Sequence, residues 1–71
     1  MEVEYGTIGR EQKRRVVTIT KDTDEEGITL VVGHDGLIVG ADCCLTGEMV
    51  ALVVDLMNHW LDTGTLPERK E

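Results

Sequence analysis

One segment constrains the fold of this chain more than any other. Residues 46–64, TGEMVALVVDLMNHWLDTG, have the pattern of a single amphipathic helix. At about 100° per residue, its apolar side chains cover an arc of about 200°, roughly twice what a helix needs to lie on one core. Thr46 can accept a hydrogen bond from a first-turn amide, and Gly64 suits the left-handed residue that ends many helices. The pattern predicts a helix with more apolar surface than one small sheet can cover.

A β-hairpin is predicted immediately before this helix, in residues 27–42. Asp35-Gly36 stands between two apolar runs and is typical of a two-residue type I′ turn, which pairs Val32 with Val39. Because side chains alternate along a strand, one face of the hairpin is then almost wholly apolar. We expect the helix to cover this face, which consists of Ile28, Leu30, Val32, Leu37, Val39, Ala41 and Cys43.

The remaining segments complete a single small domain, residues 1–71. Residues 14–20, RRVVTIT, form another predicted strand whose inward face is ambiguous. Residues 1–12 are an edge strand or a flexible arm, and residues 65–71 are a C-terminal tail. The sequence therefore predicts an α+β fold, in which a three- or four-stranded antiparallel meander has one C-terminal helix packed on one face.

The small size of the chain favours self-association. A chain near 71 residues buries only about 60% of its unfolded surface, and this one contains no phenylalanine. Small domains gain stability from disulfides, metals or oligomerisation, and two adjacent cysteines do not make a disulfide framework. We therefore predict a homodimer whose interface is one flank of the helix: Val50, Val54, Met57 and Leu61. Met49, Leu52, Leu56 and Trp60 would then face the sheet, and the reverse assignment of the two flanks is the alternative.

Charge and hydropathy narrow the classes of partner. The net charge is −7, which disfavours nucleic acid, because neutralising phosphates dominates that affinity. A basic cluster, Arg10, Lys13, Arg14 and Arg15, is interpreted as a solvated strand edge that resists aggregation, with a phosphate or RNA contact as the alternative. No apolar run reaches the ~20 residues that cross a bilayer, and the N-terminus has no secretory pattern. We expect a cytoplasmic protein that has no membrane partner and binds a second copy of itself or another protein.

Cys43 and Cys44 are the most reactive residue types in the chain. A zinc site with His34 and His59 would have to bridge about 20 Å along the strand and helix, so we predict no metal and no cofactor. Cys44 stands just before the predicted helix, where the helix dipole can stabilise a thiolate, and it is a candidate reactive thiol. The alternative is that Cys43 packs in the core and Cys44 is a small residue at a junction.

No catalytic residue is predicted. Asp55 and His59 are spaced i, i+4 on the polar side of the helix and are interpreted as a surface ion pair. The chain contains no serine that this pair could activate, and neither cysteine reaches it. The prediction is a small non-enzymatic interaction or accessory domain.

Residues 16–68 resemble the TSCPD-type domain that ends cobalamin-dependent ribonucleotide reductases and also occurs as small free-standing proteins. The parallels are the strand ITLVVG, an Asp-Gly turn, the strand LIVGAD, and an apolar helix that runs to a glycine and LPE. The cysteine-containing signature that follows the helix in that family is absent here, so no functional residue is carried over. The resemblance implies the same topology and an accessory role. It supports the alternative of a ligand-binding accessory domain linked to nucleotide metabolism. A third hypothesis is a small thiol-dependent enzyme that uses Cys44.

Overall fold

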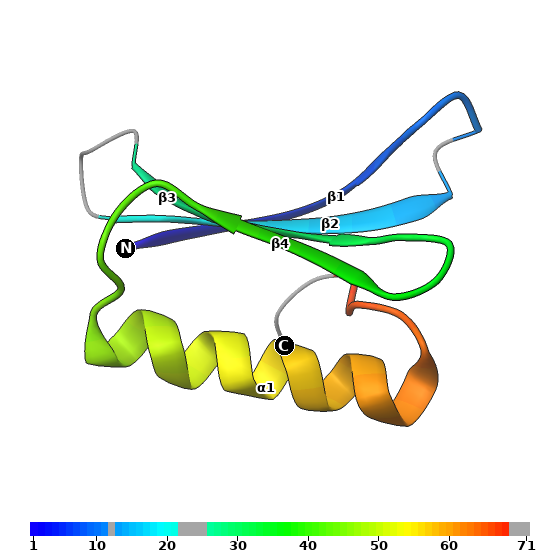
Figure 1. Ribbon diagram of the computed structural model, residues 1–71. Coiled ribbons are helices and arrows are strands. Elements are labelled where there is room, and N and C mark those ends of the chain that lie inside the picture. Colours follow the sequence, from blue (N-terminus) through cyan, green and yellow to red (C-terminus); the bar gives the residue numbers. More distant parts are fainter. Residues whose placement is uncertain (12, 22–25, 69–71) are drawn as a thin grey trace.

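The computed structural model describes residues 1–11, 13–21 and 26–68, and it has two layers (Figure 1). One layer is an antiparallel sheet and the other is a single helix lying across one face of it. The strands are β1 (Glu2–Ile8), β2 (Arg14–Thr20), β3 (Gly27–Val32) and β4 (Leu37–Ala41), and the helix is α1 (Gly47–Thr63). The predicted α+β fold is confirmed, with four strands. Residues 1–12 were expected to be an edge strand or a flexible arm, and the structure has the edge strand, β1.

The strands are hydrogen-bonded in chain order, β1-β2-β3-β4, so β1 and β4 form the two edges of this sheet. Val17 pairs with Tyr5 on one side and with Leu30 on the other, and Leu30 pairs with Val39. Directly paired residues share a face, so these four side chains lie in one row on the helix side of the sheet. Val17 and Ile19 are fully buried there, which settles the inward face of β2.

The predicted hairpin register was wrong by two residues. Val32 pairs with Leu37 instead of Val39. The Gly33 amide donates to the Gly36 carbonyl over 2.8 Å, so the two turn residues are His34 and Asp35. Gly36 is not in the positive-φ conformation that a type I′ turn at positions 35–36 would need. Because the shift is even, each side chain stays on its predicted face.

The core lies between α1 and the middle of the sheet. Its buried side chains are Val17, Ile19, Ile28, Leu30, Met49, Val53, Leu56 and Leu66. Leu66 is only 1% exposed, although it belongs to the segment expected to be a tail. The expectation that α1 covers the whole apolar hairpin face was wrong, because Val39 remains 42% exposed and Ala41 is also exposed. The helix therefore leaves the β4 side of its own sheet open.

Both ends of α1 match the prediction. The Thr46 hydroxyl accepts from the Met49 amide over 3.3 Å, and Gly64 has φ 78° and donates to the Trp60 carbonyl over 2.7 Å. The predicted ion pair between Asp55 and His59 does not form. Instead His59 Nδ1 contacts the Thr65 carbonyl over 2.9 Å, which requires the proton on Nδ1 and ties the segment after α1 to the helix. In the described part of the chain, no helix is long and apolar enough to span a bilayer.

Candidate functional site

The helix flank predicted as an interface is uncovered within the chain. Val50, Val54, Met57 and Leu61 are 46%, 50%, 36% and 72% exposed, respectively. Their spacing of four, three and four residues places them in one row along α1. The reverse assignment, in which these four residues would face the sheet, is excluded. Met49 and Leu56 are buried, and Leu52 and Trp60 pack against the core. This exposed row of four side chains is called the α1 flank below.

Strand β4 contributes a second open feature on the same side of the molecule. The Asp42 amide donates to the Gly27 carbonyl, and the Gly33 amide donates to the Gly36 carbonyl, so even-numbered residues of this strand face β3. The alternation directs the peptide groups of Leu37, Val39 and Ala41 away from β3, toward the free edge. This strand, LIVGA, contains no charged residue and no proline.

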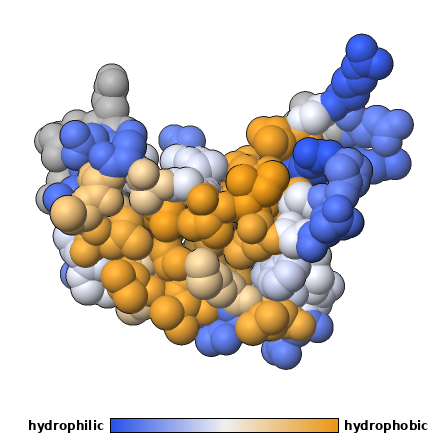
Figure 2. Space-filling model, viewed as in Figure 1, coloured by the Kyte–Doolittle hydropathy of each residue, from blue (hydrophilic) through white to orange (hydrophobic). Residues whose placement is uncertain are grey.

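The α1 flank and β4 meet at a shallow apolar groove. Leu37 and Val39 of β4 and Met57, Trp60 and Leu61 of α1 line this groove, which has a volume of about 330 Å³. Figure 2 shows that apolar residues gather over the face of the molecule that presents β4 and α1, with hydrophilic residues toward its margins. We call the α1 flank, the groove and the β4 edge together the apolar surface. The sequence analysis did not predict that the β4 edge belongs to this surface. The signal for it in the sequence is that the strand contains no charged residue.

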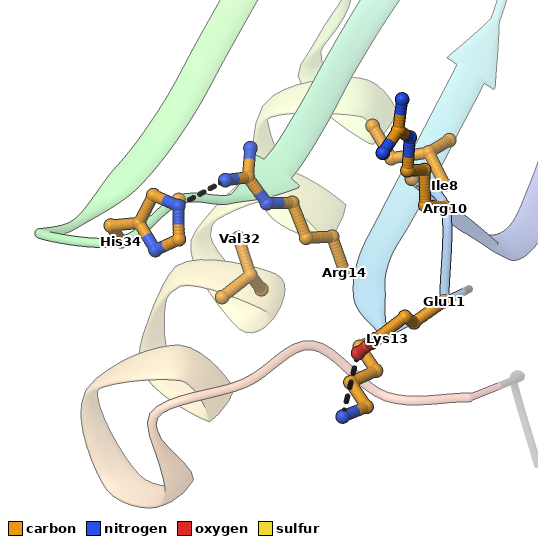
Figure 3. A pocket seen from close by; sticks show the side chains of 9 residues that line it. Ile8, Arg10, Glu11, Lys13, Arg14, Val32 and His34 are labelled. Atoms are coloured by element: carbon orange, nitrogen blue, oxygen red, sulfur yellow. Dashed lines mark hydrogen bonds and ion pairs between the residues drawn. The ribbon is translucent and has the colours of Figure 1, made fainter.

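A second hollow lies at the end of the sheet where the β1–β2 and β3–β4 connections come together. This basic cleft has a volume of about 330 Å³ and is lined by Ile8, Gly9, Arg10, Glu11, Lys13, Arg14, Val32, Gly33 and His34. Figure 3 shows Arg14 extending toward His34 above Val32, and the two side chains are hydrogen-bonded. Lys13 pairs with Glu11 over 2.8 Å. Three of the four residues of the predicted basic cluster therefore line one cleft.

Arg15, the fourth residue of that cluster, lies elsewhere. Successive residues of a strand point to opposite faces of the sheet, so Arg15 is on the helix side, where it pairs with Glu68. His34 replaces it in the cleft, from a turn twenty residues away along the chain from Arg14. Sequence spacing gave no signal that His34 belongs with the basic cluster, because the contact depends on the pairing of β2 with β3.

The two cysteines are not part of either surface. Cys43 is partly buried against the core, and Cys44 is exposed in the connection before α1. Burial is the main cause that raises the pKa of the Cys43 thiol; the Lys21 ammonium opposes the rise and the Asp42 carboxylate adds to it. In residues 1–11, 13–21 and 26–68, no three His, Cys, Asp or Glu side chains gather as a metal site would require.

Comparisons of the chain with protein-family models, with curated proteins and with solved structures found no match. The resemblance to the TSCPD-type domain therefore stays a prediction. The site has to be interpreted from its own geometry, which offers an apolar surface suited to a macromolecular partner and a basic cleft suited to a small molecule.

Proposed function

We propose that this chain is a small non-enzymatic interaction domain that forms a homodimer through the apolar surface. The observation that carries the proposal is that the α1 flank and the β4 edge open on the same side and share one groove. A partner that extends the sheet at β4 also covers the flank. The two unpaired cysteines suit a reducing compartment, so we place the dimer in the cytoplasm.

A second copy of the chain fits this surface because β4 can pair with itself. Two identical antiparallel strands are related by a twofold axis, which is also the commonest symmetry of homo-oligomers. With Val39 opposite Val39 of the other copy, Leu37 faces Ala41, and the outward peptide groups of all three residues find partners. Their side chains are on the helix side of the sheet, so the same axis brings the two α1 flanks together.

The other edge of the sheet is a poorer site for self-pairing. Strand β1 carries Glu2 and Glu4, and carboxylates along an edge oppose pairing with a like strand. Strand β4 has no such charge, and its neighbour in space is an apolar helix flank. The composition of the two edges therefore selects β4 for association.

The energies of the flank and of the strand edge are of the size that a dimer needs. The exposed fractions of the α1 flank together equal about two fully exposed side chains per protomer. Burying them in a dimer contributes ~6–12 kcal/mol in transfer free energy, whereas association itself costs ~4–15 kcal/mol. The flank alone only about balances that cost. Peptide hydrogen bonds along β4, each worth ~0.5–1.5 kcal/mol, shift the balance toward the dimer.

Sedimentation equilibrium tests the proposal with a matched pair of variants. We expect twice the mass of the 7.9 kDa chain at micromolar protein. Val54→Asp places a carboxylate in the α1 flank, which has to be desolvated when the copies meet, so it is expected to yield monomer. Ala51→Asp adds the same charge on the same helix, at an exposed position outside the flank, and should leave the dimer intact. A wild-type monomer at high concentration would refute the proposal, and so would an equal loss of dimer in the two variants.

A further inference from the structure

We propose that the basic cleft binds a small organic anion that combines a phosphate group with an apolar part. The cleft lies outside the apolar surface, and the inference does not depend on the dimer. It rests on three observations: guanidinium groups without carboxylate partners, a hydrogen bond that orients one of them, and an apolar wall beside them.

Among the described residues, carboxylates do not neutralise the two arginines of the cleft. The whole sequence has 14 acidic residues and 7 Lys and Arg, so carboxylates are in excess. Even so, Arg10 and Arg14 have no carboxylate partner among the residues that the structure describes, whereas Arg15 outside the cleft pairs with Glu68. The one carboxylate in the lining belongs to Glu11, which forms an ion pair with Lys13. Two guanidinium groups in one hollow, each able to bind two phosphate oxygens, form a site for an anion.

The contact between Arg14 and His34 holds the Arg14 guanidinium in place. The Arg14 guanidinium donates to Nε2 of His34, which leaves the Nδ1–H of that ring as a further donor. A guanidinium has five N–H donors, so most of those on Arg14 stay available. Figure 3 shows the Arg14 side chain reaching from β2 to His34 in the β3–β4 connection. An oriented donor loses less entropy when it binds an anion than a free surface arginine does.

The apolar wall and the size of the cleft define the rest of the ligand. Ile8 is 42% exposed at one side of the cleft and Val32 lines it beneath Arg14. Val32 is half-buried against the core, but an inorganic ion would leave Ile8 in water, whereas a ring or alkyl group attached to the phosphate would cover it. A volume of about 330 Å³ is at the low end of the ~300–1,000 Å³ of ligand pockets. The net charge of −7 repels long polyanions, so the ligand is one small molecule instead of a nucleic acid.

NMR titration of the ¹⁵N-labelled protein with simple probes tests this inference. Phenyl phosphate carries both features of the proposed ligand, inorganic phosphate has only the charge, and phenol has only the ring. We expect phenyl phosphate to bind more tightly than either of the others and to shift the signals of Arg14, Gly33 and His34. Absence of binding by phenyl phosphate, or shifts centred on another part of the chain, would overturn the inference.

Two arginine variants separate a site from general charge attraction. Arg14→Gln removes charge-assisted hydrogen bonds and is expected to weaken phenyl phosphate at least about tenfold. Arg15→Gln removes the same charge from the other face and should change affinity less than about threefold, because exposed charges are screened by salt. Arg10→Gln gives a second variant in the cleft if Arg14→Gln does not fold. An equal loss of affinity for phenyl phosphate in the cleft variants and in Arg15→Gln would refute a small-anion site. Binding of a short oligothymidylate more tightly than phenyl phosphate would also refute it.

Discussion

The proposed pairing of β4 makes a strong prediction about one position. With Val39 opposite itself across the twofold axis, Val39→Lys places two ammonium groups in direct opposition in the dimer. Ile38→Lys adds the same charge to the neighbouring residue, but its side chain is on the opposite face of the sheet and 56% exposed. The two variants differ only in which face of β4 receives the charge. We expect Val39→Lys to dissociate the dimer and Ile38→Lys to preserve it.

The magnitude follows from the exposure and spacing of Val39. Burying the 42% of its side chain that is exposed contributes ~1–3 kcal/mol per dimer, counted over both copies. If the two charges were held at the ~5 Å spacing of opposed Cβ atoms, they would repel by ~1 kcal/mol in water and by ~3 kcal/mol at the dielectric of a protein surface. The substitution therefore costs about 2–6 kcal/mol, which weakens the dimer by about 30-fold to 10⁴-fold.

Concentration-dependent fluorescence and sedimentation measure this effect. Trp60 is the single tryptophan of the chain and lines the groove beside Val39, so its emission reports the separation of the copies on dilution. A charge-reversal partner makes the test specific. Val39→Glu alone should also dissociate, whereas an equimolar mixture of Val39→Lys and Val39→Glu should recover the dimer mass. If the mixture stays monomeric while each variant is folded, or if Ile38→Lys is as disruptive, Val39 does not oppose itself and the pairing is wrong.

Two further predictions concern the monomer. Gly27→Ala is expected to destabilise the fold by at least about 2 kcal/mol in urea unfolding, because an added Cβ would lie 2.0 Å from the backbone oxygen of the neighbouring strand. Gly40→Ala, which meets no atom within 4 Å, is the matched control and should be near neutral. Burial raises the pKa of Cys43, so at pH 8 its thiol is more protonated than an ordinary cysteine. Iodoacetamide should therefore label the exposed Cys44 first, and the labelling of Cys43 should accelerate as the pH rises above 8; mass-mapped labelling of Cys43 before Cys44 would contradict this.

Local signals in the sequence defined the helix completely. The 3.6-residue period, the hydroxyl of Thr46 and the left-handed preference of Gly64 each act within a few residues, and the structure places the helix ends where these signals predict. The exposure of the α1 flank was also predicted, because Met49 and Leu56 are the flank that packs inward.

The hairpin register depends on contacts that local patterns do not contain. Turns at His34-Asp35 and at Asp35-Gly36 both give two-residue loops, and they leave every side chain on the same face. The far end of the hairpin distinguishes them. The Asp42 carboxylate accepts from the Gly27 amide over 2.8 Å, while the Asp42 amide donates to the Gly27 carbonyl over 3.2 Å. Those bonds join residues fifteen apart, which is why the turn sequence alone led to the wrong register.

The position of α1 over the sheet determines which edge can associate. The helix covers Val17 and Leu30 in the central strands, and its buried row then turns the α1 flank toward β4. If the helix were turned so that this flank pointed toward the other edge of the sheet, the flank would adjoin β1, which carries Glu2 and Glu4. An apolar flank beside an acidic edge would gain no strand pairing from a second copy. The placement observed joins the one uncharged edge to the one uncovered helix flank in the described chain, so a single twofold contact buries both.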